Sequence, residues 1–148
     1  LESIRKQTYP DVETVVIEDG LEISRQMICT EYSDLQLRYI STGKRVGRAK
    51  AGNLGMKVAQ GKYLNFLDDD DVLYPEHIEI LLQTLQSAEE KAVYSVAEEA
   101  AAIYRKRKRT FYDVRKKVRF REPFNRMYLL HTNYLPIQSV MFEKSLFY

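Results

Sequence analysis

Residues 63–75 of this 148-residue chain read YLNFLDDDDVLYP, an apolar segment that ends in four consecutive aspartates and is soon followed by a proline. Four neighbouring negative charges repel one another, so folding them close together is unfavourable without a cation. A hard divalent ion held by oxygen ligands removes that cost. The stretch therefore predicts a buried strand with a metal site at its carboxyl end.

Predicted strands and helices alternate on both sides of this stretch. We expect strands over residues 12–17, 35–40, 63–67, 92–96 and 140–142, and helices over residues 22–32, 51–59 and from Pro75 onward, the last with an apolar stripe of Ile78, Leu81, Leu82 and Leu85. This alternation favours an α/β fold with a mainly parallel sheet. Ligands gather beyond the carboxyl ends of the strands in such sheets, where Glu18-Asp19 and Asp68 to Asp71 lie.

The composition is that of a globular chain that forms one domain or a piece of one. Hydrophobic residues make up 45% and charged residues 30%, and the net charge of +2 is too small to indicate a nucleic-acid partner. The lone cysteine, Cys29, excludes an internal disulfide and is expected to be a small core residue. No apolar run reaches the roughly 20 residues of a membrane-spanning helix.

The acidic run allows three other interpretations. A solvated acidic turn could cap the helix that Pro75 opens, but four adjacent acids exceed what a cap needs. An EF-hand loop is rejected, because Val72 and Leu73 occupy positions that need a ligand and a glycine. A phosphatase of the haloacid dehalogenase type, with Asp68 as nucleophile and Asp70 as acid/base, stays open as the second enzyme hypothesis.

Two longer segments narrow the choice: SIRKQTYPDVETVVIEDG over residues 3–20 and AKAGNLGMKVAQGKYLNFLDDDDVLYPEHIE over residues 49–79. Their order resembles the nucleotide-sugar-binding half of family 2 glycosyltransferases, which have the Rossmann-like GT-A fold. The matching positions are Gln7 to Pro10, Asp19-Gly20, Asn53, Gly55, Ala59, Gly61, Phe66 to Asp71 and Pro75. The later stretches EPFNRMYLL and NYLPIQSVMFEKSLF resemble the segment that follows in this family.

The resemblance implies a role for each matching polar residue. Asp70 is the expected main ligand of Mn²⁺ or Mg²⁺, and Asp68 is a second ligand. Asp19 is expected to hold the base of the nucleotide, most simply uracil, through its ring N–H. Glu18, at a position where the family more often has Asp, and Asn53 are also expected to contact the nucleotide-sugar. Asp68 and Asp69 are expected to contact ribose, metal-bound water or sugar hydroxyls. Because Gly52 stands where the family often has Arg, Lys50 or Arg48 is expected to supply the cation for the base or phosphate.

The resemblance also implies an activity and a division of the chain. The activity is metal-dependent, inverting transfer of a sugar from a nucleotide-diphospho-sugar, UDP-linked by preference, to a hydroxyl of a saccharide or other acceptor. Residues 1–97 would form the nucleotide-sugar-binding part and residues 98–148 the start of the acceptor-side part. A first strand is expected before Leu1 and the catalytic base, an aspartate, beyond Tyr148, so the domain is incomplete at both ends. A non-catalytic nucleotide-sugar-binding module is the alternative outside enzymes.

A dense cationic stretch follows residue 104, with Arg105 to Arg109 and then Arg115 to Lys117. We interpret it as a solvated charged hairpin on the acceptor side, with association with a membrane surface as the second interpretation and no nucleic-acid partner. The expected location is therefore the cytoplasm, at the inner face of the membrane under the second interpretation. His77 is expected on the exposed side of its helix, and no catalytic role is expected for it.

Overall fold

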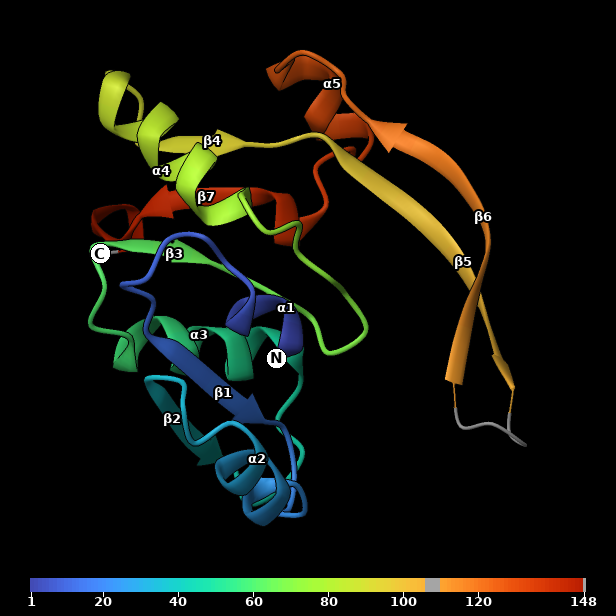
Figure 1. Ribbon diagram of the computed structural model, residues 1–148. Helices are drawn as coiled ribbons and strands as arrows, with labels where there is room; N and C mark the ends of the chain where they lie inside the picture. Colours follow the sequence, from blue (N-terminus) through green and yellow to red (C-terminus); the bar gives the residue numbers. More distant parts are fainter. Residues whose placement is uncertain (106–109, 148) are drawn as a thin grey trace.

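The computed structural model describes residues 1–105 and 110–147 (Figure 1). In chain order the elements are α1 (Glu2–Arg5), β1 (Thr14–Glu18), α2 (Arg25–Glu31), β2 (Leu37–Ser41), α3 (Arg48–Val58), β3 (Tyr63–Asn65), α4 (His77–Ser87), β4 (Ala92–Tyr94), β5 (Ala97–Arg105), β6 (Thr110–Phe120), α5 (Arg126–His131) and β7 (Val140–Glu143), with short 3-10 turns at η1 (Ile137–Ser139) and η2 (Lys144–Phe147). Each strand and helix expected from the sequence is present, with its ends shifted or shortened.

Strands β1 and β2 form a parallel pair, as the alternation of strands and helices predicts. Thr14 lies beside Leu37 at one end of the pair, and Glu18 lies beside Ser41 at the other. Parallel strands bring their carboxyl ends to the same edge. The loops that follow Glu18 and Ser41 therefore start side by side, which places Asp19 next to the segment that leads into α3.

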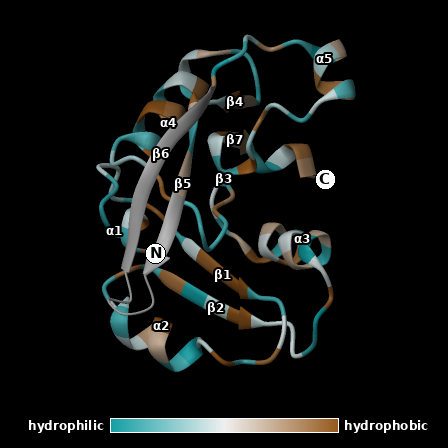
Figure 2. Cartoon of the chain, turned by 90° about the vertical axis from the view of Figure 1, so that its right-hand side faces the viewer, coloured by the Kyte–Doolittle hydropathy of each residue, from teal (hydrophilic) through white to brown (hydrophobic). Residues whose placement is uncertain are grey.

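Strand β7 lies between β3 and β4 and runs antiparallel to both. Its Met141 is 4% exposed and packs with Leu81, Leu82 and Leu85 of α4 in the buried core. The apolar stripe predicted for α4 is therefore confirmed. Burial of these leucines against Met141 stabilises the packing of α4 on β7. Figure 2 shows hydrophobic residues in the β1–β2 pair, in β7 and on α4.

Two glycines of α3 face neighbouring segments: Gly55 faces Ile17 of β1, and Gly52 faces Phe66. A Cβ added at Gly55 would lie 3.4 Å from Cγ1 of Ile17, and one added at Gly52 would lie 3.5 Å from Cε1 of Phe66. Helices α3 and α2 lie on opposite sides of the β1–β2 pair (Figures 1 and 2). The contact with Phe66 joins the packing of α3 to the segment that leads into the aspartate run.

The N-terminal turn Gln7-Thr8 is docked on the start of α4, far away in the sequence. Oε1 of Gln7 accepts a hydrogen bond from the backbone N–H of Ile78 at 3.0 Å, so a distant side chain caps this helix. Nε2 of Gln7 donates to the carbonyl of Tyr74 at 2.8 Å, and the N–H of Thr8 donates to the carbonyl of Pro75 at 2.9 Å. These bonds fix the C-terminal end of the loop that carries the aspartates.

Strands β5 and β6 form an antiparallel hairpin with register shifts between Glu99 and Ala100 and between Ala101 and Ala102. The hairpin predicted for the cationic stretch is therefore present in the backbone. Arg115 to Lys117 lie on β6, whereas residues 106–109 lie outside the described residues.

Two predictions about single residues are wrong. Cys29 is exposed, because α2 buries none of its residues. His77 is half-buried rather than exposed, and its Nε2 lies 2.9 Å from Oδ1 of Asn65 at the end of β3. Burial lowers the pKa of His77, while a hydrogen bond to the backbone of Gln138 opposes that shift. The imidazole thus joins α4 to β3 and to η1.

Replacing Leu81 should test the α4 core. Leu81 is 3% exposed, so Leu81→Ala should leave a cavity and lower the free energy of unfolding by about 3 kcal/mol in urea titrations. The matched control is Ile80→Ala on the same helix, where the side chain is 56% exposed and the change should stay within about 0.5 kcal/mol. Equal losses at the two positions would contradict the assignment of the core.

Removing the Gln7 side chain should test the docking of the N-terminal turn. Gln7→Ala leaves the N–H of Ile78 without its cap and should lower the free energy of unfolding by about 1–2 kcal/mol. Gln83→Ala is the control, because that side chain makes one exposed 3.4 Å bond to Glu79 on its own helix. Faster amide exchange at Ile78 in the Gln7 variant alone would confirm the cap, and unchanged exchange would refute it.

Candidate metal and nucleotide-sugar site

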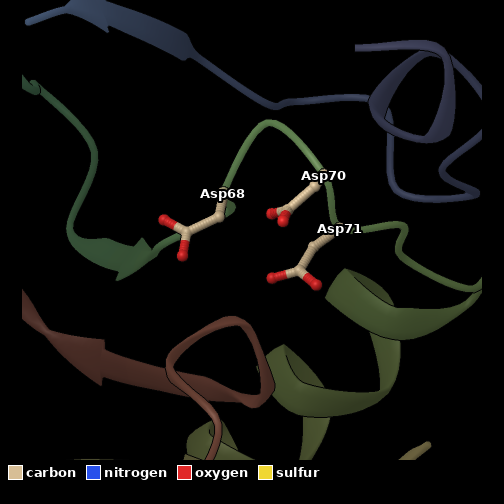
Figure 3. Close-up of side chains that lie close together, drawn as sticks. All are labelled: Asp68, Asp70 and Asp71. Atoms are coloured by element: carbon tan, nitrogen blue, oxygen red, sulfur yellow. The ribbon is translucent and has the colours of Figure 1, made fainter. Parts of the chain in front are cut away.

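The four aspartates form a turn rather than a continued strand. Strand β3 ends at Asn65, and the N–H of Asp71 donates to the carbonyl of Asp68 at 3.2 Å. The turn lies in the loop between β3 and α4, and it places carboxylate oxygens of Asp68, Asp70 and Asp71 within 4.8 Å of one another (Figure 3). Asp68 and Asp70 are thus brought together as predicted, but by a turn instead of by strand extension past Leu67.

Asp71 is a member of this cluster that the sequence did not single out, whereas Asp69 is exposed and lies outside it. Alternation along an extended strand would have placed Asp71 on the opposite face from Asp68 and Asp70. The pKa of Asp71 is raised, first by burial and then by the negative charges of Asp70 and Asp68. Oxygen donors under mutual repulsion suit a hard divalent cation, so the residues present fit such an ion.

Arg48 is the cation that contacts this cluster. It is the first residue of α3, and its guanidinium donates to Oδ2 of Asp68 at 3.0 Å. The Arg48 side chain is 85% exposed and that of Asp68 is 35% exposed. An ion pair this open to water adds little stability. Arg48 can therefore leave Asp68 at small cost, for example toward a phosphate oxygen.

Asp19, which follows β1, already uses both of its carboxylate oxygens. Oδ1 accepts the N–H of Val46 at 2.7 Å, and Oδ2 accepts the N–H of Gly47 at 2.9 Å. These bonds lower the pKa of Asp19, with the Val46 bond as the largest cause; burial opposes them, while Thr42 and Arg45 assist. Asp19 is thus ionised at neutral pH and holds the loop that enters α3.

Glu18 is turned toward the start of α2. Its carboxylate accepts the N–H groups of Ile23 and Ser24, both at 3.2 Å, and the hydroxyl of Ser24 at 3.1 Å. Lys50 and Asn53 are both exposed, one helical turn apart on α3. Of the predicted nucleotide-contacting residues, Glu18 and Asp19 thus lie at the end of β1, Lys50 and Asn53 on α3, and Asp68 and Asp69 in the turn after β3.

The described ranges, 1–105 and 110–147, hold no helix that is both long enough and apolar enough to pass through a bilayer.

Comparison with known proteins gives one family and several relatives. The sequence model for glycosyl transferase family 2 matches residues 1–147. The chain is 33% identical over 95 residues to glycosyltransferase GlyG of Streptococcus pneumoniae, which covers 63% of this chain and 32% of that protein. It is 42% identical over 89 residues to an uncharacterized glycosyltransferase of Rickettsia felis, covering 58% of this chain and 14% of that protein. GlyA of S. pneumoniae is 34% identical over 87 residues, covering 57% and 12%. The chain thus spans a third or less of these relatives.

Substituting Asp71 should separate fold stability from metal binding. The raised pKa means that the ionised carboxylate opposes folding; this penalty is absent below the pKa of the unfolded chain and complete above that of the folded protein. Asp71→Asn should therefore raise the melting temperature of the metal-free protein at pH 7, and the gain should vanish in acid.

The same substitution should weaken Mn²⁺ binding by about tenfold, because one charged ligand is lost. Asp69→Asn removes a neighbouring charge outside the cluster and should change both quantities much less. Thermal melting with and without Mn²⁺ measures both effects. Lower stability of the metal-free Asp71→Asn protein, or equal Mn²⁺ affinity in the two variants, would contradict the cluster.

Proposed function

Because the chain belongs to glycosyl transferase family 2, we propose that it holds the donor-binding part of an enzyme that transfers a sugar from a nucleotide-diphospho-sugar to an acceptor hydroxyl. The α/β architecture with the parallel β1–β2 pair is that of a Rossmann-like GT-A fold. One observation carries the proposal. In a family 2 chain, three carboxylates converge within 4.8 Å at the end of β3, the kind of site that binds a metal and a diphosphate.

Asp70 and Asp68 are the proposed ligands of Mn²⁺ or Mg²⁺, and the geometry adds Asp71 to them. Such an ion would supply positive charge to the leaving diphosphate. The turn at 68–71 holds the carboxylates close together before any ion arrives, so little ordering remains for binding. Arg48 stands beside Asp68 and offers a second positive charge on the same side.

The proposed nucleotide contacts come from the end of β1, from α3 and from the aspartate turn itself. A carboxylate has about four lone-pair sites, so Asp19 can accept a uracil N–H besides the two backbone N–H groups that it already binds. Lys50 and Asn53 present a cation and an amide on the exposed surface of α3. Asp69, exposed beside the cluster, is suited to ribose or sugar hydroxyls. Glu18 would act from the end of β1, where its carboxylate faces the start of α2.

The division of labour within the chain follows the same proposal. Residues 1–97 would bind the donor, and residues 98–148 would begin the acceptor side, with a saccharide as the favoured acceptor. Inverting transfer needs a base for the acceptor hydroxyl, and we assign that role to no residue in the described part of the chain. We propose that the enzyme works in the cytoplasm. The family match does not favour the phosphatase alternative with Asp68 as nucleophile.

Calorimetric titration with UDP, GDP and dTDP, each with and without Mn²⁺, tests the function. UDP should bind only with Mn²⁺ present, and Asp70→Ala should weaken that binding by at least about tenfold, because the central metal ligand is lost. Asp34→Asn is the control, since Asp34 is exposed and pairs with Arg5 away from the cluster. If no nucleotide binds in a metal-dependent way, the donor-binding proposal fails.

A further inference from the structure

The loop over residues 42–47 is hydrogen-bonded at both of its ends to the residues that follow β1. Asp19 accepts the N–H groups of Val46 and Gly47, at 2.7 and 2.9 Å. Thr42 accepts the N–H of Gly20 at 2.9 Å, and its hydroxyl lies 2.8 Å from the carbonyl of Lys44. The two ends of the loop are therefore fixed by the residues that follow Glu18.

This loop leads into the first residue of α3, Arg48, whose side chain contacts the aspartate cluster. Gly47 is the residue before α3, and its φ of +94° lies in the left-handed region that favours glycine. Arg48 comes next, and its guanidinium reaches Asp68 at 3.0 Å. A continuous set of contacts thus runs from Asp19 through Gly47 to Arg48 and Asp68. Both ends of this path belong to the site, yet Asp19 does not touch the aspartate turn through any of these bonds.

We propose that Asp19 is a positioning residue: by binding the N–H groups of Val46 and Gly47, it holds Arg48 beside Asp68. Only the consequence for donor binding rests on the proposed function. The positioning itself is a property of the free protein.

The chemistry of the bonds requires a carboxylate at position 19. Two N–H donors point at two oxygens, and the charge strengthens both bonds. In Asp19→Asn, one of these positions is taken by an NH₂ group, which faces an N–H and cannot accept from it. The variant has nearly the same shape, but it should release one half of the loop. Arg45 is the charged group that acts on Asp19 from the loop itself.

Positioning makes a prediction about metal binding that base recognition does not. While Arg48 is held at Asp68, it competes with a cation for that carboxylate. Asp19→Asn should therefore strengthen binding of Mn²⁺ alone by about threefold, the range expected when an exposed ion pair is lost. Arg48→Ala should give a similar gain, and the double variant should gain no more than either single variant. A role limited to the nucleotide base would leave Mn²⁺ affinity unchanged.

Two measurements test the proposal. In NMR spectra of the nucleotide-free protein, the amide signals of Val46 and Gly47 should move together on acidification in the wild type, as Asp19 takes up its proton. They should be displaced in Asp19→Asn and unchanged in the charge-matched control Asp34→Asn. Calorimetry with Mn²⁺ alone should then give the non-additive pattern for Asp19→Asn and Arg48→Ala.

The outcomes separate this proposal from the proposed function. Amide signals that ignore the protonation of Asp19, or additive gains in Mn²⁺ affinity, would overturn positioning even if UDP binds as expected. If the wild type binds no Mn²⁺, the donor-binding proposal fails, and the amide titration alone then decides on Asp19. Should Asp19→Asn fail to fold, the wild-type titration of Val46 and Gly47 still gives the answer.

Discussion

Mutual repulsion among the aspartates at 68–71 is the constraint around which the site is organised. The pKa of Asp71 is raised first by burial and then by the negative charges of Asp70 and Asp68, so repulsion is one part of that shift. The turn is held at both ends by interactions that do not depend on a cation. Phe66 packs against Gly52 before the turn, and Gln7 fixes the start of α4 after it. The fold thus supplies the free energy that keeps like charges together, and a bound cation would recover part of it.

Much of this arrangement can be predicted from the sequence, because hydrophobic periodicity and the Gly and Pro residues at the ends of elements indicate local structure. The α4 stripe, the parallel β1–β2 pair and the hairpin in the cationic region all follow from such patterns. The role of Asp71 could not be predicted in this way, since a turn and an extended strand assign different faces to the same four residues. The antiparallel position of β7 between β3 and β4 could not be predicted either, because strand partners that are distant in sequence leave no local signal. Cys29 was misplaced because α2, although apolar in part, buries no residue.

The two acidic residues at the end of β1, Glu18 and Asp19, both hold neighbouring segments of the chain, in addition to the nucleotide binding proposed for them. Glu18 organises the start of α2, and Asp19 organises the loop into α3. Both carboxylates are therefore held in place by the protein itself, which would lower the entropy cost of the proposed nucleotide binding. Substitutions at these two positions would thus disturb the segments that they hold as well as the proposed nucleotide contact.

The position of β7 in the sheet has a consequence for the order of folding. Strands β3 and β4 do not pair with each other; each pairs with β7, which comes from residues 140–143. During synthesis, the β1–β2 pair and α3 can assemble once residue 58 is available, whereas the sheet of β3, β7 and β4 must wait until residue 143 has been added. Contacts this distant in sequence form slowly, and α4 meanwhile exposes its leucines to solvent. A nascent chain of this protein would accordingly be most prone to aggregation between these two stages.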